Sequence, residues 1–320
     1  MKRRTFLLTA GSAAGLAAAA AGRRYWDDGL PAKVPPAGTK DLGSNMYYVR
    51  SDYEFVDYQI YEHQGYWLRG PAPETLVAGN YITFAGAAQT FGRFAAEPFP
   101  TRVGKALNAP VLNLGFGAYG PGDFGYGPEL LKAINAGRFL VLQVMAGRSA
   151  SNSAMVNTAG RHVDYQGQNM TAEAAWQKAI EDDSLTAERF WTLVDETRQD
   201  WLNQYAALIT RIEVPIVLLY IGADAPRCKE DRSRKPADLA ALTGRHPQLV
   251  TQDMFDTVAA QCQRVVESVT DYGLPQPLTA PIYDEKGQPG QTVNEYYPSP
   301  EMHLAAARKL FPVCRELWTA

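Results

Sequence analysis

Serine, histidine and carboxylate side chains gather in the middle of the chain. Three serines alternate in the segment AGRSASNS, residues 146–153, and His162 and Asp164 follow shortly after it. A hydroxyl beside a histidine and a carboxylate can attack an acyl group, whatever the chain order of the three. The candidate catalytic residues are Ser149, Ser151, Ser153, His162 and His303. The alternative is that the serines form turns and that His303, within a helical pattern, is a packing residue.

A second chemical motif is GFGAYG, residues 115–120, which has the glycine spacing of a dinucleotide-binding loop. That loop requires a helix to begin within the motif and an acid at the end of the next strand. Here Pro121 and Gly122 follow, and the next apolar run ends in Gln143. We therefore expect no nicotinamide or flavin, and predict a rim whose glycines let backbone amides approach a ligand.

Metal chemistry has little support in the sequence. The four histidines lie far apart, with no HExxH pair and no carboxylate cluster at ligand spacing. We therefore expect no cofactor of any kind, and we place His63 and His246 at the surface. Cys228, Cys262 and Cys314 match no metal spacing and allow at most one disulfide, so each is expected to be a small buried residue.

The elements that must position these residues follow a regular alternation from Tyr81 onward. Buried strands are predicted at residues 81–86, 109–116, 138–145 and 214–222, because each is a short continuous apolar run. Helices are predicted at residues 98–108, 127–137, 171–183, 186–212, about 252–272 and 299–318. Apolar strands alternating with helices predict a single α/β domain, a doubly wound, flavodoxin-like parallel sheet with helices on both faces. Ligands bind such a sheet at the carboxyl ends of its strands.

Three short motifs give this pattern a family resemblance. They are G-x-x-x-T-x-G at residues 86–92, NLG at residues 113–115 and PSPEMH at residues 298–303. In this order they resemble the SGNH or GDSL hydrolases, esterases of acyl and acetyl groups, from about Tyr81 to the C terminus. The segments DYQIYEHQGYWLRGP, GAAQTFGRF and NSAM are more narrowly similar to a bacterial family of unknown function.

The resemblance implies that the usual catalytic triad is absent. It assigns the nucleophilic serine to Ala88, and the final aspartate and histidine to Asn294 and Tyr297. The oxyanion glycine corresponds to Gly115, and Asn152 is the nearest amide to the family's third block. A methyl group at position 88 cannot attack an acyl carbon, so ordinary ester hydrolysis is not expected there.

The sequence pattern of the N terminus predicts an export signal. A basic head with Arg3 and Arg4, followed by Thr5, Phe6 and Leu7 and an alanine-rich run, resembles a twin-arginine signal. We expect a signal peptide at residues 1–22, a passing interaction with the twin-arginine translocase, and a periplasmic or secreted protein without a stable membrane span. The alternative is a single membrane anchor.

Residues 23–78 are predicted to be an extended arm, followed by the α/β domain at residues 79–320. The arm is rich in aromatic residues, particularly in the segment YYVRSDYEFVDYQIYEHQGYW, residues 47–67. These rings either pack on the domain or form a platform for sugar rings.

The net charge of −3 arises from 31 basic and 34 acidic residues without long blocks of one sign, which argues against nucleic-acid binding. We expect an exported SGNH-like protein that lacks the triad and binds, or helps to process, a cell-envelope carbohydrate or another small ligand. The alternative is an acyl-ester hydrolase or acyltransferase with a relocated serine. The predicted pocket residues are Ala87, Ala88, Gln89, Thr90, Gly115, Gly117, Arg148, Ser149, Asn152 and Tyr297.

Overall fold

The computed structural model describes residues 45–227, 230–284 and 287–320. The predicted signal peptide, the first part of the predicted arm and Cys228 lie outside the described residues. Cys262 and Cys314 are free thiols. Within the described part of the chain, no helix is long and apolar enough to cross a membrane.

The centre of the fold is a parallel sheet of five strands with the spatial order β10-β9-β5-β3-β4. The strands are β3 (Ile82–Gly86), β4 (Val111–Gly115), β5 (Phe139–Gln143), β9 (Ile216–Gly222) and β10 (Arg264–Val269). Numbered along the chain, these strands read 2-1-3-4-5 across the sheet, which is the flavodoxin-like order. The predicted fold class is therefore confirmed, and the order reverses between β3 and β5.

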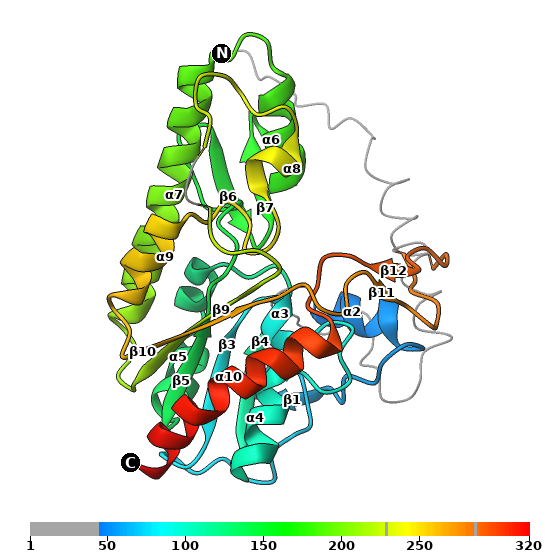
Figure 1. Cartoon of the computed structure of the whole chain (residues 1–320), viewed down its shortest axis with the longest axis vertical. Coiled ribbons are helices and arrows are strands. Elements are labelled where there is room, and N and C mark those ends of the chain that lie inside the picture. Colours follow the sequence, from blue (N-terminus) through cyan, green and yellow to red (C-terminus); the bar gives the residue numbers. More distant parts are fainter. Residues whose placement is uncertain (1–44, 228–229, 285–286) are drawn as a thin grey trace, which may run out of the picture.

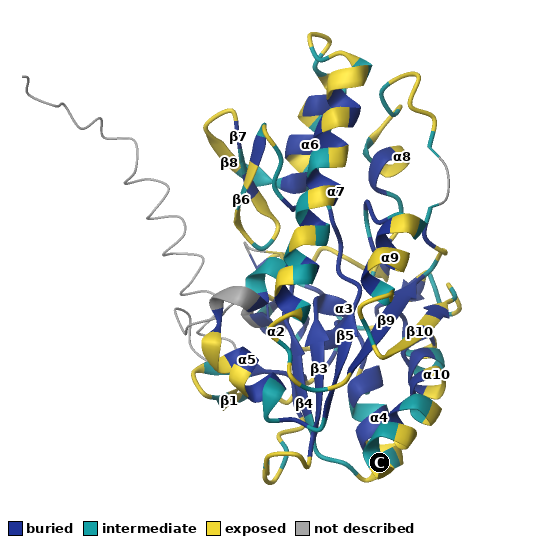
Figure 2. Ribbon diagram, turned by 90° about the vertical axis from the view of Figure 1, so that its left-hand side faces the viewer, coloured by how far each residue is buried: buried dark blue, intermediate teal, exposed yellow. Residues whose placement is uncertain are grey.

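Helices cover both faces of this sheet (Figure 1). One face carries α4 (Phe99–Leu107) and α10 (Pro300–Thr319), and the other carries α5 (Pro128–Asn135), α7 (Ala187–Ile209) and α9 (Gln252–Ala259). The strands β4, β3, β5 and β9 are buried along most of their length (Figure 2). Burial on both faces explains why these strands are continuous apolar runs in the sequence.

A second, smaller layer stands beyond the carboxyl ends of the strands (Figure 1). It contains an antiparallel sheet of β6 (Met155–Ala159), β7 (His162–Tyr165) and β8 (Gln168–Thr171), with α6 (Ala172–Glu181) and α8 (Leu239–Thr243). The first half of α7 extends into this layer, where Phe190 and Trp191 pack with Trp176 in a separate apolar core. The helices α6 and α7 were predicted from the sequence, but none of the three strands was.

The described part of the predicted arm contains regular structure. It forms α2 (Asn45–Asp52) and a hairpin of β1 (Tyr61–His63) and β2 (Tyr66–Leu68). Short elements complete the fold: α3 (Ala88–Phe91), the 3-10 helix η1 (Pro121–Tyr126), and the antiparallel pair β11 (Gln276–Pro277) and β12 (Val293–Asn294).

The helix predicted over residues 252–272 is wrong in its second half. The helix α9 ends at Ala259, and the chain then forms β10, the edge strand beside β9. In β10 only Val266 and Ser268 are buried. A half-exposed edge strand carries alternating residues, RVVESV, so it lacks the continuous apolar run that identified the other strands.

Candidate ligand-binding site

A cavity of about 760 Å³ opens at the carboxyl ends of β3, β4 and β5. Its floor is made by the loops that follow these strands, including Ala87, Gly117 and Ala146. Its other walls come from α2, from the turn between β6 and β7, from the loop before α10, and from His246. The cavity therefore lies where the strand order reverses, which is the usual ligand site of this sheet type.

A buried hydrogen-bond centre fixes the floor of the cavity. The side-chain oxygen of Gln143, at the end of β5, accepts bonds from the backbone N–H groups of Ala87 and Thr90, each at 3.1 Å. It also accepts a bond from the Thr90 hydroxyl at 2.6 Å. Of the two polar atoms of a side-chain amide, only the oxygen can accept from an N–H group, so the orientation of this amide is determined and its nitrogen must donate. That nitrogen faces Gln89 Oε1 and His246 Nε2, each at 3.2 Å.

His246 is buried in the cavity wall, so its predicted position at the surface is wrong. It is only 5% exposed, because the segment after β9 returns over the sheet edge and brings it against Gln143 and Tyr296. Burial, and to a smaller extent the nearby Arg148, lowers its pKa to about 3. The ring is therefore neutral near pH 7. Its Nε2 accepts from Gln143, which places the proton on Nδ1.

Arg148 enters the cavity from the loop after β5. Its Nε donates to the carboxylate of Glu173 in α6 at 2.6 Å, and its side chain is 12% exposed. Burial alone would lower the pKa of Arg148, but Tyr296 and Glu173 outweigh burial and raise it above the ordinary value. The guanidinium is therefore a fixed cation. Among the described residues, its two terminal nitrogens have no hydrogen-bond partner.

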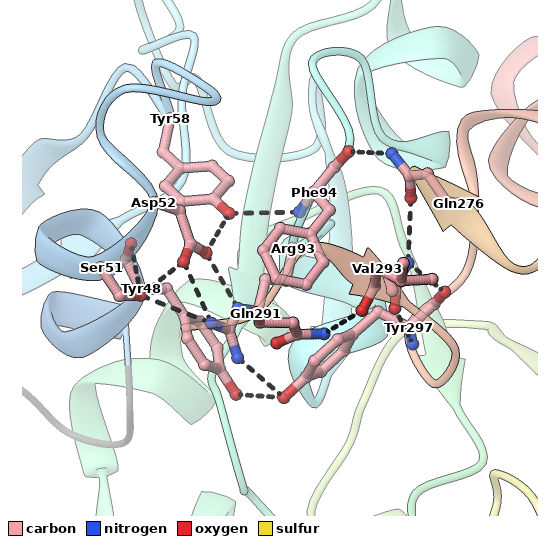
Figure 3. Close-up of polar contacts among 11 residues, drawn as sticks. Tyr48, Ser51, Asp52, Tyr58, Arg93, Phe94, Gln276, Gln291, Val293 and Tyr297 are labelled. Carbon is pink, nitrogen blue, oxygen red and sulfur yellow. Dashed lines mark hydrogen bonds and ion pairs between the residues drawn. The ribbon is translucent and has the colours of Figure 1, made fainter. Parts of the chain in front are cut away.

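A second arginine, Arg93, ties α2 to the cavity (Figure 3). Its Nε and one terminal nitrogen donate to the two oxygens of Asp52, at 2.9 and 3.0 Å, and its other terminal nitrogen donates to the Tyr297 hydroxyl at 3.2 Å. The guanidinium lies over the rings of Tyr48 and Tyr297, at 4.3 and 5.0 Å from their centroids. The side chain of Asp52 is fully buried, so this pair is a charged link between the arm and the domain.

The far wall of the cavity carries one carboxylate, Asp123 in η1. Burial raises its pKa, while hydrogen bonds from the backbone N–H groups of Gly120 and Gly160 oppose that rise. Since Gly160 belongs to the turn between β6 and β7, Asp123 links η1 to the second, smaller layer.

Seven of the ten predicted pocket residues line the cavity. They are Ala87, Ala88, Gln89, Gly117, Arg148, Ser149 and Tyr297. Thr90, Gly115 and Asn152 do not line it. The Asn152 side chain instead bonds the Thr197 hydroxyl and the N–H groups of Ala154 and Met155, so it shapes the turn before β6.

Gly115, assigned to the oxyanion position by the resemblance, has a packing role. Its N–H donates to Asn113 Oδ1 at 2.9 Å, and its carbonyl accepts from Asn45 Nδ2 at 3.0 Å. A Cβ at this position would lie 2.0 Å from the backbone nitrogen of Phe91, so only glycine lets α3 pack on β4. The N–H is therefore already occupied and cannot stabilise an oxyanion.

The candidate catalytic residues divide into two groups. Ser149 and His162 line the cavity. The Ser151 hydroxyl accepts from the N–H of Asn157, and the Ser153 hydroxyl bonds Glu196 and Arg189 outside the cavity. Among the described residues, none of the three hydroxyls is hydrogen-bonded to a histidine.

His303 lies in the sheet core, away from the cavity. It is fully buried in α10, stacks on Phe99 with ring centroids 5.7 Å apart, and accepts the Phe99 N–H through Nδ1 at 3.2 Å. Burial is the main cause that lowers its pKa to about 3. This matches the packing alternative stated for His303.

The described residues contain no group of three histidine, cysteine, aspartate or glutamate side chains that could hold a metal ion. Polar groups able to hold an organic ligand are instead spread around the cavity.

Arg93 and His246 line the cavity but were not among the predicted pocket residues, and Tyr48 was predicted only as one ring of the aromatic arm. For Tyr48 and Arg93 a signal existed, because an aromatic-rich segment and an arginine beside the first strand end can meet across a sheet edge. For His246 no local pattern indicated burial. Of the arm's rings, most pack on the domain, whereas Tyr47 and Tyr48 also line the cavity.

One protein family and several solved structures match the chain. The family described as "Domain of unknown function (DUF6473)" matches residues 46–156 and 181–318, and the chain belongs to this family. No curated protein matches the chain.

Several solved structures are distantly similar. One is a carbohydrate acetylesterase family member from Sinorhizobium meliloti, with 13% identity, a TM-score of 0.38, and coverage of 75% of this chain and 100% of that one. Another is a catalytic mutant of an acetylxylan esterase from Geobacillus stearothermophilus, with 13% identity, a TM-score of 0.35, and coverage of 75% and 95%. A likeness this distant bears on neither the activity nor the ligand of the chain.

Proposed function

We propose that this protein binds a cell-envelope carbohydrate in the cavity at the carboxyl edge of the sheet, without forming a covalent intermediate. The observation that carries the proposal is the composition of the walls. Tyrosine rings stand beside fixed hydrogen-bonding groups, and Ala88 occupies the position that the resemblance assigns to the nucleophile. A sugar needs both kinds of group, since rings stack on its apolar faces and polar side chains bond its hydroxyls.

The aromatic wall consists mainly of Tyr47, Tyr48, Tyr296 and Tyr297. Tyr296 packs edge-on against Tyr297, with centroids 5.0 Å apart, and edge-on against His246 at 6.1 Å. Contacts on two sides restrict this ring, so it can serve as a stacking surface with little loss of conformational entropy on binding. Location outside the cytoplasm, as expected from the N-terminal signal, would bring this surface to envelope glycans.

The test is a thermal-shift screen of the protein against envelope oligosaccharides. A binder present at about 100 times its dissociation constant should raise the melting temperature by several degrees. Tyr296→Ala should abolish the rise, because it removes the stacking ring. Tyr272→Ala is the matched control, since this tyrosine is 72% exposed and lies outside the cavity. No shift with any glycan would contradict the proposal.

One observation favours a second candidate function. Ser149 and His162 both line the cavity, so an esterase or acyltransferase with a relocated serine would have its two groups in the right chamber. General-base catalysis requires a hydrogen bond of about 3 Å between them, and catalytic hydrogen bonds can tighten on substrate binding. Covalent labelling of Ser149 separates this candidate from the first.

A further inference from the structure

The end of the Arg148 guanidinium is a donor on the cavity wall that has no acceptor among the described residues. Glu173 takes the Nε side, which leaves the pair of terminal nitrogens as the free edge of the fork. That edge matches the two oxygens of a carboxylate, which can accept two parallel N–H bonds. A sugar hydroxyl has only one oxygen and no charge, so it would use half of this edge.

We propose that the cavity selects sugars that carry a carboxylate, bound by the two terminal nitrogens of Arg148. This inference rests on the proposed carbohydrate binding and names the class of sugar. The carboxylate can belong to a uronic acid ring or to a lactyl ether on an amino sugar, because both present the same two oxygens to the arginine.

The experiment compares each acid with its own neutral form. Isothermal titration calorimetry of the full chain uses oligosaccharides of glucuronic, galacturonic and mannuronic acid and a muramic-acid glycan, each with a carboxyl-reduced counterpart. At least one acid should bind about tenfold to a hundredfold more tightly than its alcohol, as expected for charge-assisted bonds to a buried arginine. The uronic and muramic arms distinguish the two sources of the carboxylate.

Variants then locate the selectivity. Arg148→Met should reduce the preference for the acid to less than about twofold while the reduced sugar still binds, which also reports that the cavity is intact. Arg234→Met is the control, because this side chain is 83% exposed and lies outside the cavity.

Each outcome decides the inference. Equal binding of acid and alcohol by the unmodified protein overturns it and leaves the proposed function standing. Binding of neither form by the unmodified protein, together with no thermal shift in the wider screen, overturns both. If Arg148→Met lowers the melting temperature sharply, Arg148→Gln takes its place, and a preference retained in that variant also overturns the inference.

Discussion

Individual positions explain why the ester hydrolysis implied by the resemblance to SGNH hydrolases is not expected here. Ala88 offers only a methyl group, and the Gly115 N–H is taken by Asn113. Asn294 lies at the position assigned to the acid, and its side chain bonds the backbone of Tyr297. Its oxygen accepts from the Tyr297 N–H, and its nitrogen donates to the Tyr297 carbonyl. The Tyr297 hydroxyl accepts from Arg93. We therefore expect that a serine at position 88 alone does not create an esterase site.

Ala88→Ser tests this directly. We expect its hydrolysis of p-nitrophenyl acetate to stay within about twofold of the unmodified protein, because a serine without a base lacks the hundredfold or greater gain of general-base catalysis. Ala146→Ser is the matched control, since Ala146 also lines the cavity. A rise of a hundredfold or more in Ala88→Ser alone would show that a base and an oxyanion site are present after all.

Among the elements, α2 makes the most consequential contribution that the sequence did not reveal. It carries Tyr48 to the cavity and Asp52 to Arg93. It also places the Asn45 side chain between the carbonyl of Gly115 and the N–H of Gly117, at 3.0 and 2.9 Å. The arm therefore contributes residues to the site and stabilises the domain.

Asp52→Asn should destabilise the protein by about 3–5 kcal/mol, because it leaves the buried Arg93 charge uncompensated. Asp195→Asn is the matched control. Asp195 also pairs with an arginine, Arg232, but both side chains are about half exposed, 52% and 45%, so the expected loss is below about 1 kcal/mol. Urea denaturation measures both variants. If Asp52→Asn lowers the free energy of unfolding by no more than the control does, the link between α2 and the domain adds no stability.

The strands at the centre of the sheet were predictable because burial on both faces makes them apolar throughout, as in VPIVLLYIG. The edge strand β10 was not predictable, because only alternate residues are buried in it. Its residues also follow α9 closely in the sequence, so the two were predicted as one helix. In the site, Gln89 and Arg148 were predictable since they directly follow strands. Arg93 and His246 depend on partners distant in sequence, Asp52 and Gln143, which local patterns do not reveal.

As a whole, the molecule brings three parts together around one cavity. The sheet edge provides the floor, the arm provides a tyrosine wall, and the small layer of β6, β7 and β8 closes the opposite side. The central claim is that this chamber binds its ligand without serine chemistry.

The most direct test of that claim is labelling of the folded protein with a fluorophosphonate, followed by intact-mass measurement and peptide mapping, beside an active serine esterase as positive control. The account predicts no adduct on the folded protein. A stoichiometric adduct on Ser149 that disappears when the protein is unfolded before labelling would contradict it, and would establish a relocated nucleophile in the cavity.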